Sequence, residues 1–471
     1  MIPMKFGRVA SALDTACKLH ERDIVVRRVT TDSRDILPGD LFFAVRGPRF
    51  DGHDFVQESI ARGAVAAVVE REVAVPAVGS LITNPVVTLR VSDTVEALGQ
   101  LAFYYRREVM DAETVVVAVT GSNGKTTTKC MIDHVLGGRL QGRASPKSFN
   151  NQLGVPLSIL SAEDSDRYLV LEVGTNHPGE IAALASIGSP TVAVITSIGE
   201  AHLEGLASLD GVAAEKCSLL DHVRPGGFAV VNVDRDVIWP HLHARPRLRL
   251  VTIGFSPTAG TPVKSISSAL HGTVSELEGR YRLELPMPGA HHATNAAAAF
   301  VVGRWFGIPP WEVLERLRSF HPPEGRTRVL TLGVGTVVDD TYNANPASVA
   351  AAIDALSRES PGKRVFVLGD MLELGREVGS HHCEMIHLAA SSGIETFVAV
   401  GSATTNEARQ FGASAGDMRV ICCDGLESVV QTLLPLVAAG HTLWLKASRG
   451  MQLDQVVARL RTNFDMQTAV A

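Results

Sequence analysis

A short glycine-rich segment with a lysine and a threonine carries the clearest chemical signal in this sequence. The apolar run Val-Val-Val-Ala-Val at 115–119 leads into Gly121-Ser122-Asn123-Gly124-Lys125-Thr126. Glycines let backbone N–H groups converge on phosphate oxygens, a lysine supplies positive charge, and a threonine hydroxyl can ligate Mg²⁺. Because an apolar strand precedes the loop and a helical pattern over 125–136 follows it, the segment predicts a nucleotide triphosphate site.

The spacing of this loop differs from that of the common P-loop. The pattern G-x-x-x-x-G-K-[ST] requires a glycine at position 119, where this chain has Val119. A short Gly/Lys/Thr match also arises by chance, and the alternative is an ordinary turn from strand to helix. Residues elsewhere in the chain must therefore decide between the two.

Three ionisable residues are candidates for metal or phosphate chemistry. Glu172 ends the apolar run 168–171, where a carboxylate is costly unless it meets a cation, so a Mg²⁺ ligand is favoured over a structural salt bridge. His202 follows the predicted strand 192–196, but a loop histidine is the simpler interpretation because imidazole is an unusual ligand for Mg²⁺. Lys216 lies on a predicted helix, where a solvated lysine is the default.

A second polar segment follows a predicted strand near the end of the chain. Asp339 and Asp340 end the strand predicted over 333–338 and lead into Thr-Tyr-Asn-Ala-Asn-Pro at 341–346. These residues could form an ordinary turn. Because ligands gather at the carboxyl ends of parallel strands, the position favours contact with a ligand.

Strand-like and helix-like runs alternate along most of the chain, which predicts an α/β fold with parallel sheets covered by helices. The length of 471 residues favours two or three domains. We expect a small α/β unit over 1–112, a central unit over 113–325 and a doubly wound unit over 326–471. Predicted strands are 40–45, 64–69, 115–119, 168–173, 192–196, 228–232, 337–339, 364–368, 396–400 and 442–445; predicted helices are 55–62, 125–136, 180–187 and 209–220.

Composition excludes several classes of protein. The formal net charge of -6 and the lack of a basic stripe argue against nucleic-acid binding. The six cysteines have no C-x-x-C spacing, so neither a zinc site nor a disulfide framework is predicted. The N-terminus lacks an apolar signal region, and the longest uncharged stretch, 181–199, is broken by Gly-Ser-Pro. We therefore expect a cytoplasmic protein with no membrane span.

Motifs along nearly the whole chain resemble those of the Mur ligase family, in the same order. The resemblance implies a small N-terminal α/β domain that binds a uridine diphosphate (UDP) substrate, a central P-loop domain with a parallel sheet and ATPase chemistry, and a C-terminal Rossmann-like doubly wound domain. The matching segments are 31–34, 38–43, 51–55, 121–126, 150–156, 172–180, 201–204, 339–346, 368–375 and 445–449.

The resemblance implies a role for each candidate in nucleotide and metal binding. Lys125 would hold the ATP phosphates, with Thr126, Glu172 and His202 holding Mg²⁺. Lys216 matches the lysine that the family carbamylates, which becomes an anion able to ligate a second Mg²⁺. This overturns the solvated default. Catalytic roles are thereby implied for Lys125, Glu172, His202 and Lys216; the nucleotide would be bound by Gly121, Ser122, Asn123, Gly124, Lys125, Thr126 and Thr127, with Asn295 at the adenine and Arg326 and Asp340 in the C-terminal part of the site.

The resemblance also implies contacts with the two other substrates. The expected reaction joins D-Ala-D-Ala to the terminal carboxylate of UDP-N-acetylmuramoyl-tripeptide through an acyl phosphate, for peptidoglycan synthesis, and the enzyme is expected to act as a monomer. The substrate residues would be Ser33, Asp51, Gly52 and His53 near the uridine diphosphate, together with Asn150, Asn151, Asn343, Asn345, Asp370, His382, Lys446, Ser448 and Arg449.

Rival functions fit the motifs of the sequence less well. A sister ligase that adds the third amino acid to UDP-muramoyl dipeptide would share the ATP site, but its Asp-Asn-Pro-Arg-type motif is absent. Folylpolyglutamate synthase should lack the N-terminal segments at 32–34 and 51–53. A P-loop kinase or regulatory NTPase fits neither the shortened loop nor the three-part layout. The sequence leaves open whether the third peptide residue is diaminopimelate or lysine.

Overall fold

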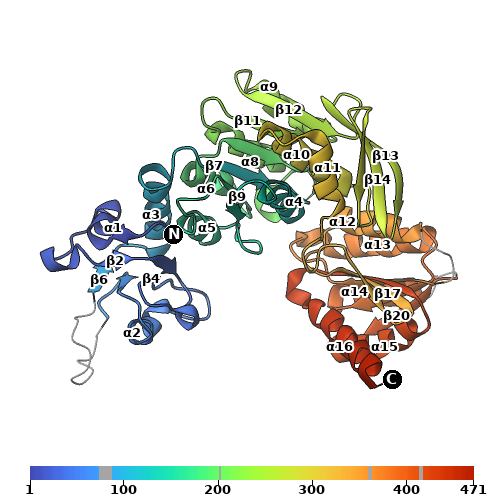
Figure 1. Ribbon diagram of the computed structural model, residues 1–471. Helices are drawn as coiled ribbons and strands as arrows, with labels where there is room; N and C mark the ends of the chain where they lie inside the picture. Colours follow the sequence, from blue (N-terminus) through green and yellow to red (C-terminus); the bar gives the residue numbers. More distant parts are fainter. Residues whose placement is uncertain (74–86, 201–202, 359–362, 413–416, 471) are drawn as a thin grey trace.

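Three main β-sheets divide the protein into successive α/β units (Figure 1). A computed structural model describes residues 1–73, 87–200, 203–358, 363–412 and 417–470. In Figure 1 the N-terminal unit lies to the left of the central unit and the C-terminal unit to its right. The α/β class and the three-part architecture predicted from the sequence are confirmed. The domain boundaries expected at 112 and 325 stay predictions.

The N-terminal unit is a four-stranded parallel sheet in the order β3-β4-β5-β6. Strands β4 and β5 are buried at every position, as expected for a parallel sheet covered on both faces. Tyr105 joins this unit to the next, because its hydroxyl donates to the carbonyl of Ala162 at 2.6 Å. The elements are β1 (Met4–Lys5), α1 (Phe6–Ala12), β2 (Val25–Val26), β3 (Arg28–Thr30), β4 (Asp40–Phe43), α2 (Val56–Ala61), β5 (Ala66–Val69), β6 (Val87–Arg90) and α3 (Thr94–Glu108).

The central unit contains a nine-stranded sheet in the order β15-β14-β13-β12-β11-β10-β7-β9-β8. Strands β8 to β13 are parallel, whereas β13, β14 and β15 pair antiparallel. The sequence did not predict this antiparallel extension. The strands are β7 (Val115–Thr120), β8 (Gly142–Ala144), β9 (Tyr168–Glu172), β10 (Val192–Ile195), β11 (Phe228–Asn232), β12 (Arg249–Gly254), β13 (Thr261–Ala269), β14 (Gly272–Leu277) and β15 (Tyr281–Leu285).

Helices cover both faces of the parallel part of this sheet. Because side chains alternate along β7, Val117 and Val119 pack in one core cluster with residues of α4 and α10, and Val116 and Ala118 pack in the opposite one. The helix predicted over 209–220 ends earlier, at Cys217, and continues as a 3₁₀ turn. The helices are α4 (Lys125–Gly137), α5 (Gly154–Leu160), α6 (Glu180–Gly188), α7 (Leu203–Leu206), α8 (Leu209–Cys217), α9 (Trp239–His243), α10 (His292–Trp305) and α11 (Pro310–Arg318).

The C-terminal unit is a doubly wound sheet in the order β16-β17-β21-β18-β19-β20, in which only the β16–β17 pair is antiparallel. Helices α12, α13 and α14 pack on one face, and α15 and α16 on the other. The elements are β16 (Arg328–Leu332), β17 (Gly335–Asp340), α12 (Pro346–Ser357), β18 (Arg364–Gly369), α13 (Val378–Ser391), β19 (Thr396–Val400), α14 (Ser402–Gly412), β20 (Arg419–Cys423), α15 (Leu426–Ala438), β21 (Thr442–Lys446) and α16 (Asp454–Val470).

Within the described ranges, none of the helices combines the length and apolar character needed to cross a bilayer. All six cysteines are free thiols.

Candidate active site

The glycine loop lies between β7 and α4, as predicted. Gly121 and Gly124 have φ angles of 151° and 81°, and φ angles of this kind favour glycine. A Cβ atom would lie 2.0 Å from the Thr196 hydroxyl at Gly121 and 2.4 Å from Oδ1 of Asn295 at Gly124. The loop therefore needs both glycines, because its backbone passes directly against two neighbouring side chains.

Lys125 begins α4 and curls back over the loop. Its Nζ donates to the carbonyl of Gly121 at 2.7 Å and to that of Ser122 at 3.4 Å. Burial lowers the pKa of Lys125; nearby Glu172 opposes this shift and Arg326 adds to it. The Lys125 side chain therefore lies at the N-terminus of α4, where its positive charge and the backbone N–H groups both favour binding of an anion.

Glu172, the last residue of β9, is 1% exposed. Its Oε1 accepts a hydrogen bond from Nδ2 of Asn150 at 3.0 Å, and its Oε2 lies 3.4 Å from Nζ of Lys129. Oε2 has no hydrogen-bond donor within the described part of the chain. A buried carboxylate oxygen without a hydrogen-bond donor fits a hard divalent cation. The structural salt bridge, which was the alternative interpretation of Glu172, is also present, with Lys129 as its cation.

Thr126 and Arg326 meet across the joint between the central and C-terminal units. The Thr126 hydroxyl accepts from Nη2 of Arg326 at 3.1 Å. The guanidinium of Arg326 lies 3.8 Å from the centre of the Tyr342 ring, and that of Arg449 lies 4.8 Å from the same ring. Two arginines therefore stack on one tyrosine at the joint.

His202 lies outside the described residues. Among the residues that the structure describes, no group of three or more His, Cys, Asp or Glu side chains has the arrangement of a metal site. The role of His202 as a metal ligand therefore stays a prediction.

Lys216 on α8 is 1% exposed, so the default of a solvated lysine is wrong. Burial and the charge of Lys125 bring the pKa of Lys216 well below its ordinary value. The neighbouring Glu215 accepts from the backbone N–H groups of Gly179 and Ile181 at 2.7 and 2.8 Å, which fixes α8 against the start of α6. Burial therefore favours the uncharged amine of Lys216 over its ammonium form.

Asp340 and Asn345 link the C-terminal unit to the site. Asp340 Oδ2 lies 2.6 Å from Nζ of Lys446, which also donates to the Asn343 carbonyl at 3.0 Å. Asn345 caps α12 through the Ser348 N–H and donates from Nδ2 to Oδ1 of Asn123 at 2.8 Å. The glycine loop is thereby tied directly to the C-terminal unit.

A single cavity of about 710 Å³ takes residues from all three units. Arg46 comes from the N-terminal unit, Lys125 and Glu172 from the central unit, and Tyr342 and Lys446 from the C-terminal unit. Predicted residues on its wall are Ser122, Asn123, Gly124, Lys125, Thr126, Thr127, Asn150, Asn151, Glu172, Asn295, Arg326, Asp340, Asn343, Asn345 and Lys446.

Other predicted residues form contacts inside their own units. His382 is fully buried, with Nε2 accepting from the Met371 N–H at 2.9 Å, and Asp370 accepts from the Thr404 N–H at 2.8 Å. Ser33 lies in a 3₁₀ turn of the N-terminal unit. Predicted residues that are not part of the described cavity wall are Ser33, Asp51, Gly52, His53, Gly121, Lys216, Asp370, His382, Ser448 and Arg449.

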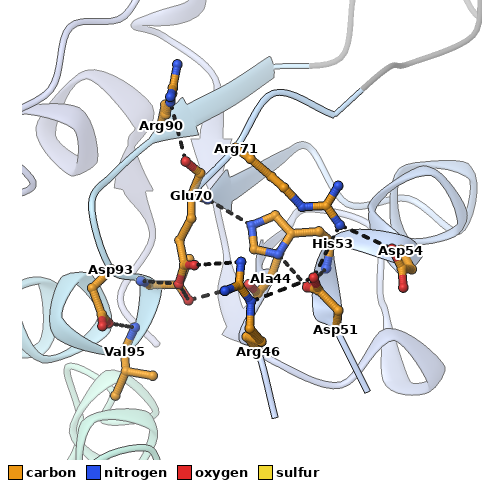
Figure 2. Close-up of polar contacts among 11 residues, drawn as sticks. Ala44, Arg46, Asp51, His53, Asp54, Glu70, Arg71, Arg90, Asp93 and Val95 are labelled. Atoms are coloured by element: carbon orange, nitrogen blue, oxygen red, sulfur yellow. Dashed lines mark hydrogen bonds and ion pairs between the residues drawn. The ribbon is translucent and has the colours of Figure 1, made fainter. Parts of the chain in front are cut away.

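The segment Asp51-Gly52-His53 holds the loop that carries Arg46 (Figure 2). His53 is 2% exposed; its Nδ1 lies 2.6 Å from Oδ1 of Asp51, and its Nε2 accepts from the Glu70 N–H at 2.8 Å. The backbone N–H of His53, its ring and Arg71 lower the pKa of Asp51 to about 2. Arg46 lies 3.8 Å from Asp51 and 3.5 Å from Glu70. Both ring nitrogens of His53 are therefore engaged within the unit.

Replacing His53 with leucine is expected to lower the free energy of unfolding by about 2 kcal/mol, because the Glu70 N–H loses its buried acceptor. Chemical denaturation measures this change. The control is His20→Leu, which alters an exposed histidine of the same unit and is expected to change it by less than about 0.5 kcal/mol. Equal effects of the two substitutions would contradict the structural role of His53.

Residues in or beside the site that the sequence did not predict include Arg46, Lys129 and Tyr342. Lys129 had a signal, because it lies one helical turn after Lys125 on α4. Tyr342 lies inside the polar segment 341–346, of which only Asn343 and Asn345 were predicted to contact a substrate. Arg46 had no local signal, since its place depends on how two units meet.

Comparison with known proteins identifies the class of this enzyme. Three family models match: "Mur ligase family, catalytic domain" over residues 25–106, "Mur ligase middle domain" over 119–303 and "Mur ligase, glutamate ligase domain" over 325–449. Relatives from Bacillus subtilis and Escherichia coli are 33% and 34% identical, over 93% and 95% of this chain and 93% and 96% of theirs. The chain belongs to the Mur ligase family.

Within that family, both relatives are named UDP-N-acetylmuramoyl-tripeptide–D-alanyl-D-alanine ligase. A crystal structure of MurF from Acinetobacter baumannii superposes with a TM-score of 0.85 at 28% identity, covering 98% of this chain and 99% of that one. A Thermotoga maritima MurF ligase in complex with ADP gives 0.78 at 28% identity, covering 94% and 99%. The resemblance found in the sequence is therefore confirmed at the level of this group of ATP-dependent ligases.

The rival families share the fold alone. A UDP-N-acetylmuramoyl-L-alanyl-D-glutamate–2,6-diaminopimelate ligase is 16% identical with a TM-score of 0.54. The Mycobacterium tuberculosis folylpolyglutamate synthase is 17% identical with a TM-score of 0.61 and covers 78% of this chain. Neither rival function is favoured.

Proposed function

We propose that this protein joins D-Ala-D-Ala to the terminal carboxylate of UDP-N-acetylmuramoyl-tripeptide, with cleavage of ATP to ADP and phosphate, to make the peptidoglycan precursor UDP-N-acetylmuramoyl-pentapeptide. One observation carries the proposal: a single cavity combines the phosphate loop with side chains from three α/β units. A reaction of three substrates requires such a meeting point, and the names of the relatives from Bacillus subtilis and Escherichia coli specify the same two peptide substrates.

The chemistry follows from the poor leaving group of a carboxylate. The terminal carboxylate of the tripeptide attacks the γ-phosphorus of ATP, which gives an acyl phosphate and ADP. The amine of D-Ala-D-Ala then attacks the acyl carbon, and phosphate leaves from the tetrahedral intermediate. Phosphoryl transfer depends mainly on positioning and charge neutralisation, which Lys125 and the loop N–H groups provide.

Magnesium fits the residues of this site. Glu172, whose Oε2 has no hydrogen-bond donor among the described residues, and Thr126 both line the cavity and offer hard oxygen ligands, and His202 is proposed as a further ligand. Two bound ions would neutralise charge that develops on the phosphate oxygens. For the second ion we propose carbamylated Lys216: its neutral amine attacks carbon dioxide, a proton leaves the nitrogen, and a carbamate anion remains.

The other predicted roles are retained as proposals. Asn295 would contact the adenine, with Arg326 and Asp340 near the nucleotide, and the 51–53 segment would shape the uridine diphosphate site from within its unit. Substrate residues that lie off the cavity wall, such as Asp370 and Arg449, require movement of the C-terminal unit or act through their neighbours. We propose a cytoplasmic monomer as the working form.

The proposed function is tested by the dependence of phosphate release on substrates. We expect release from ATP only when both a UDP-muramoyl tripeptide and D-Ala-D-Ala are present. If a free amino acid with UDP-muramoyl dipeptide supports release instead, the sister-ligase function is correct. Parallel assays with diaminopimelate- and lysine-containing tripeptides identify the third residue.

A further inference from the structure

Lys129 is a buried cation for which the proposed reaction gives no role. Its side chain is 2% exposed and points from α4 toward the segment after β8. Nζ donates to the Ser145 carbonyl at 2.7 Å and to the Lys147 carbonyl, and it lies 3.4 Å from Oε2 of Glu172. Lysine is almost never buried without partners, so these contacts account for its position.

These contacts join three parts of the central unit: α4, the end of β9 and the loop 145–150. The loop also contacts Glu172 directly. Asn150 donates to Oε1 of Glu172 at 3.0 Å, and the Glu172 N–H donates to the Ser145 hydroxyl at 3.2 Å. One oxygen of the carboxylate is therefore held by an amide. The other, Oε2, faces an ammonium that is close enough for charge interaction but makes no hydrogen bond to it.

We propose that Lys129 is a positioning residue that holds Glu172 and the 145–150 loop, and that its charge keeps the Glu172 site weak for a divalent cation until a nucleotide is present. The inference rests on the proposed metal role of Glu172. The Lys129 ammonium beside Oε2 repels an approaching divalent cation, so the protein side chains alone bind the cation poorly. Phosphate oxygens supply the missing ligands, which couples entry of the metal to entry of ATP.

The test measures Mn²⁺, as a probe for Mg²⁺, binding to the nucleotide-free protein by electron paramagnetic resonance. Lys129→Met removes the charge and the donors; Lys129→Gln removes the charge but keeps an N–H donor. Both are expected to bind Mn²⁺ on the order of tenfold more tightly than the unmodified protein, because the repulsion is lost. The control is Lys147→Met, which removes an exposed charge from the same loop and should leave Mn²⁺ binding unchanged.

Each outcome separates this inference from the proposed metal site. If Lys129→Met and Lys129→Gln bind Mn²⁺ as weakly as the unmodified protein, Lys129 is a structural tether only and the inference is wrong. Adding Glu172→Gln to either variant should abolish the tighter binding. Mn²⁺ binding that is insensitive to Glu172→Gln in every background would instead refute the metal role of Glu172.

Folding is controlled by a double variant. Lys129→Met leaves a buried carboxylate without its cation, which can prevent folding. The combination Lys129→Met with Glu172→Gln removes both charges and is expected to recover a thermal transition close to that of the unmodified protein. A double variant as unstable as Lys129→Met alone would contradict the pairing of these two residues.

Discussion

Replacing Lys125 with methionine is expected to lower kcat for phosphate release by about a thousandfold. The ammonium lies at the start of α4, bonded to the carbonyls of the loop that would cradle the phosphates. Methionine keeps the length of the side chain and removes the charge. The loss should therefore fall on the transfer step, where charge on the γ-phosphate oxygens develops, more than on the fold.

Three measurements separate these effects: steady-state phosphate release with all substrates, calorimetric binding of ADP, and thermal unfolding. The control is Lys264→Met, which removes an exposed charge from β13 in the same unit and should leave all three unchanged. A kcat for Lys125→Met within tenfold of the unmodified enzyme would rule out a direct role in phosphoryl transfer.

Replacing Lys216 with alanine is expected to lower kcat by at least about a hundredfold, and a short carboxylic acid such as acetate should restore part of it. The physical reason is the proposed carbamate: an added carboxylate in the space left by the side chain would offer oxygen ligands to the second Mg²⁺ that we propose. The unmodified enzyme should also retain labelled carbon dioxide that can be trapped by alkylation. Activity that is unaltered in Lys216→Ala would remove the carbamate hypothesis.

From the burial of Lys216 we also predict how the stability of the protein changes with pH and when this lysine is replaced. The pKa of Lys216 in the folded protein is well below its ordinary value because burial and Lys125 disfavour the charge. The unfolded chain therefore binds more protons than the folded one between the two pKa values, and stability rises with pH across this window. Without carbon dioxide, Lys216→Met should unfold at a higher temperature than the unmodified protein near neutral pH, and this advantage should vanish above the pKa of unfolded lysine.

Much of the fold could be predicted because its signals are local. Apolar runs such as 115–119 and 192–196 become buried parallel strands, and the patterns at 125–136 and 180–187 become the helices that follow strands. The antiparallel β13–β15 extension was not predicted, because its strands carry alternating, partly exposed residues without a strong apolar run. The 3₁₀ ending of α8 was missed because the helical pattern continues beyond Cys217.

Whether a site residue could be predicted depends on how far its partners lie from it along the chain. Glu172 was predicted because a carboxylate ending an apolar strand is informative by itself. Lys216 could not be judged from its helix, since its burial depends on packing around α8 rather than on its neighbours in sequence. The role proposed for Lys129 depends on its contacts with Ser145 and Glu172, which lie near it only in the folded sheet that contains β8 and β9.

The sequence by itself determined the glycine loop, the order of the three units and, through motifs spread along the chain, the family, because each depends on residue types at short spacing. Only the tertiary structure decided which of these residues share one cavity, that Lys216 is buried, and that Lys129 lies beside Glu172. Burial and charge pairing are properties of packed elements, so they depend on contacts between distant segments that no local pattern contains.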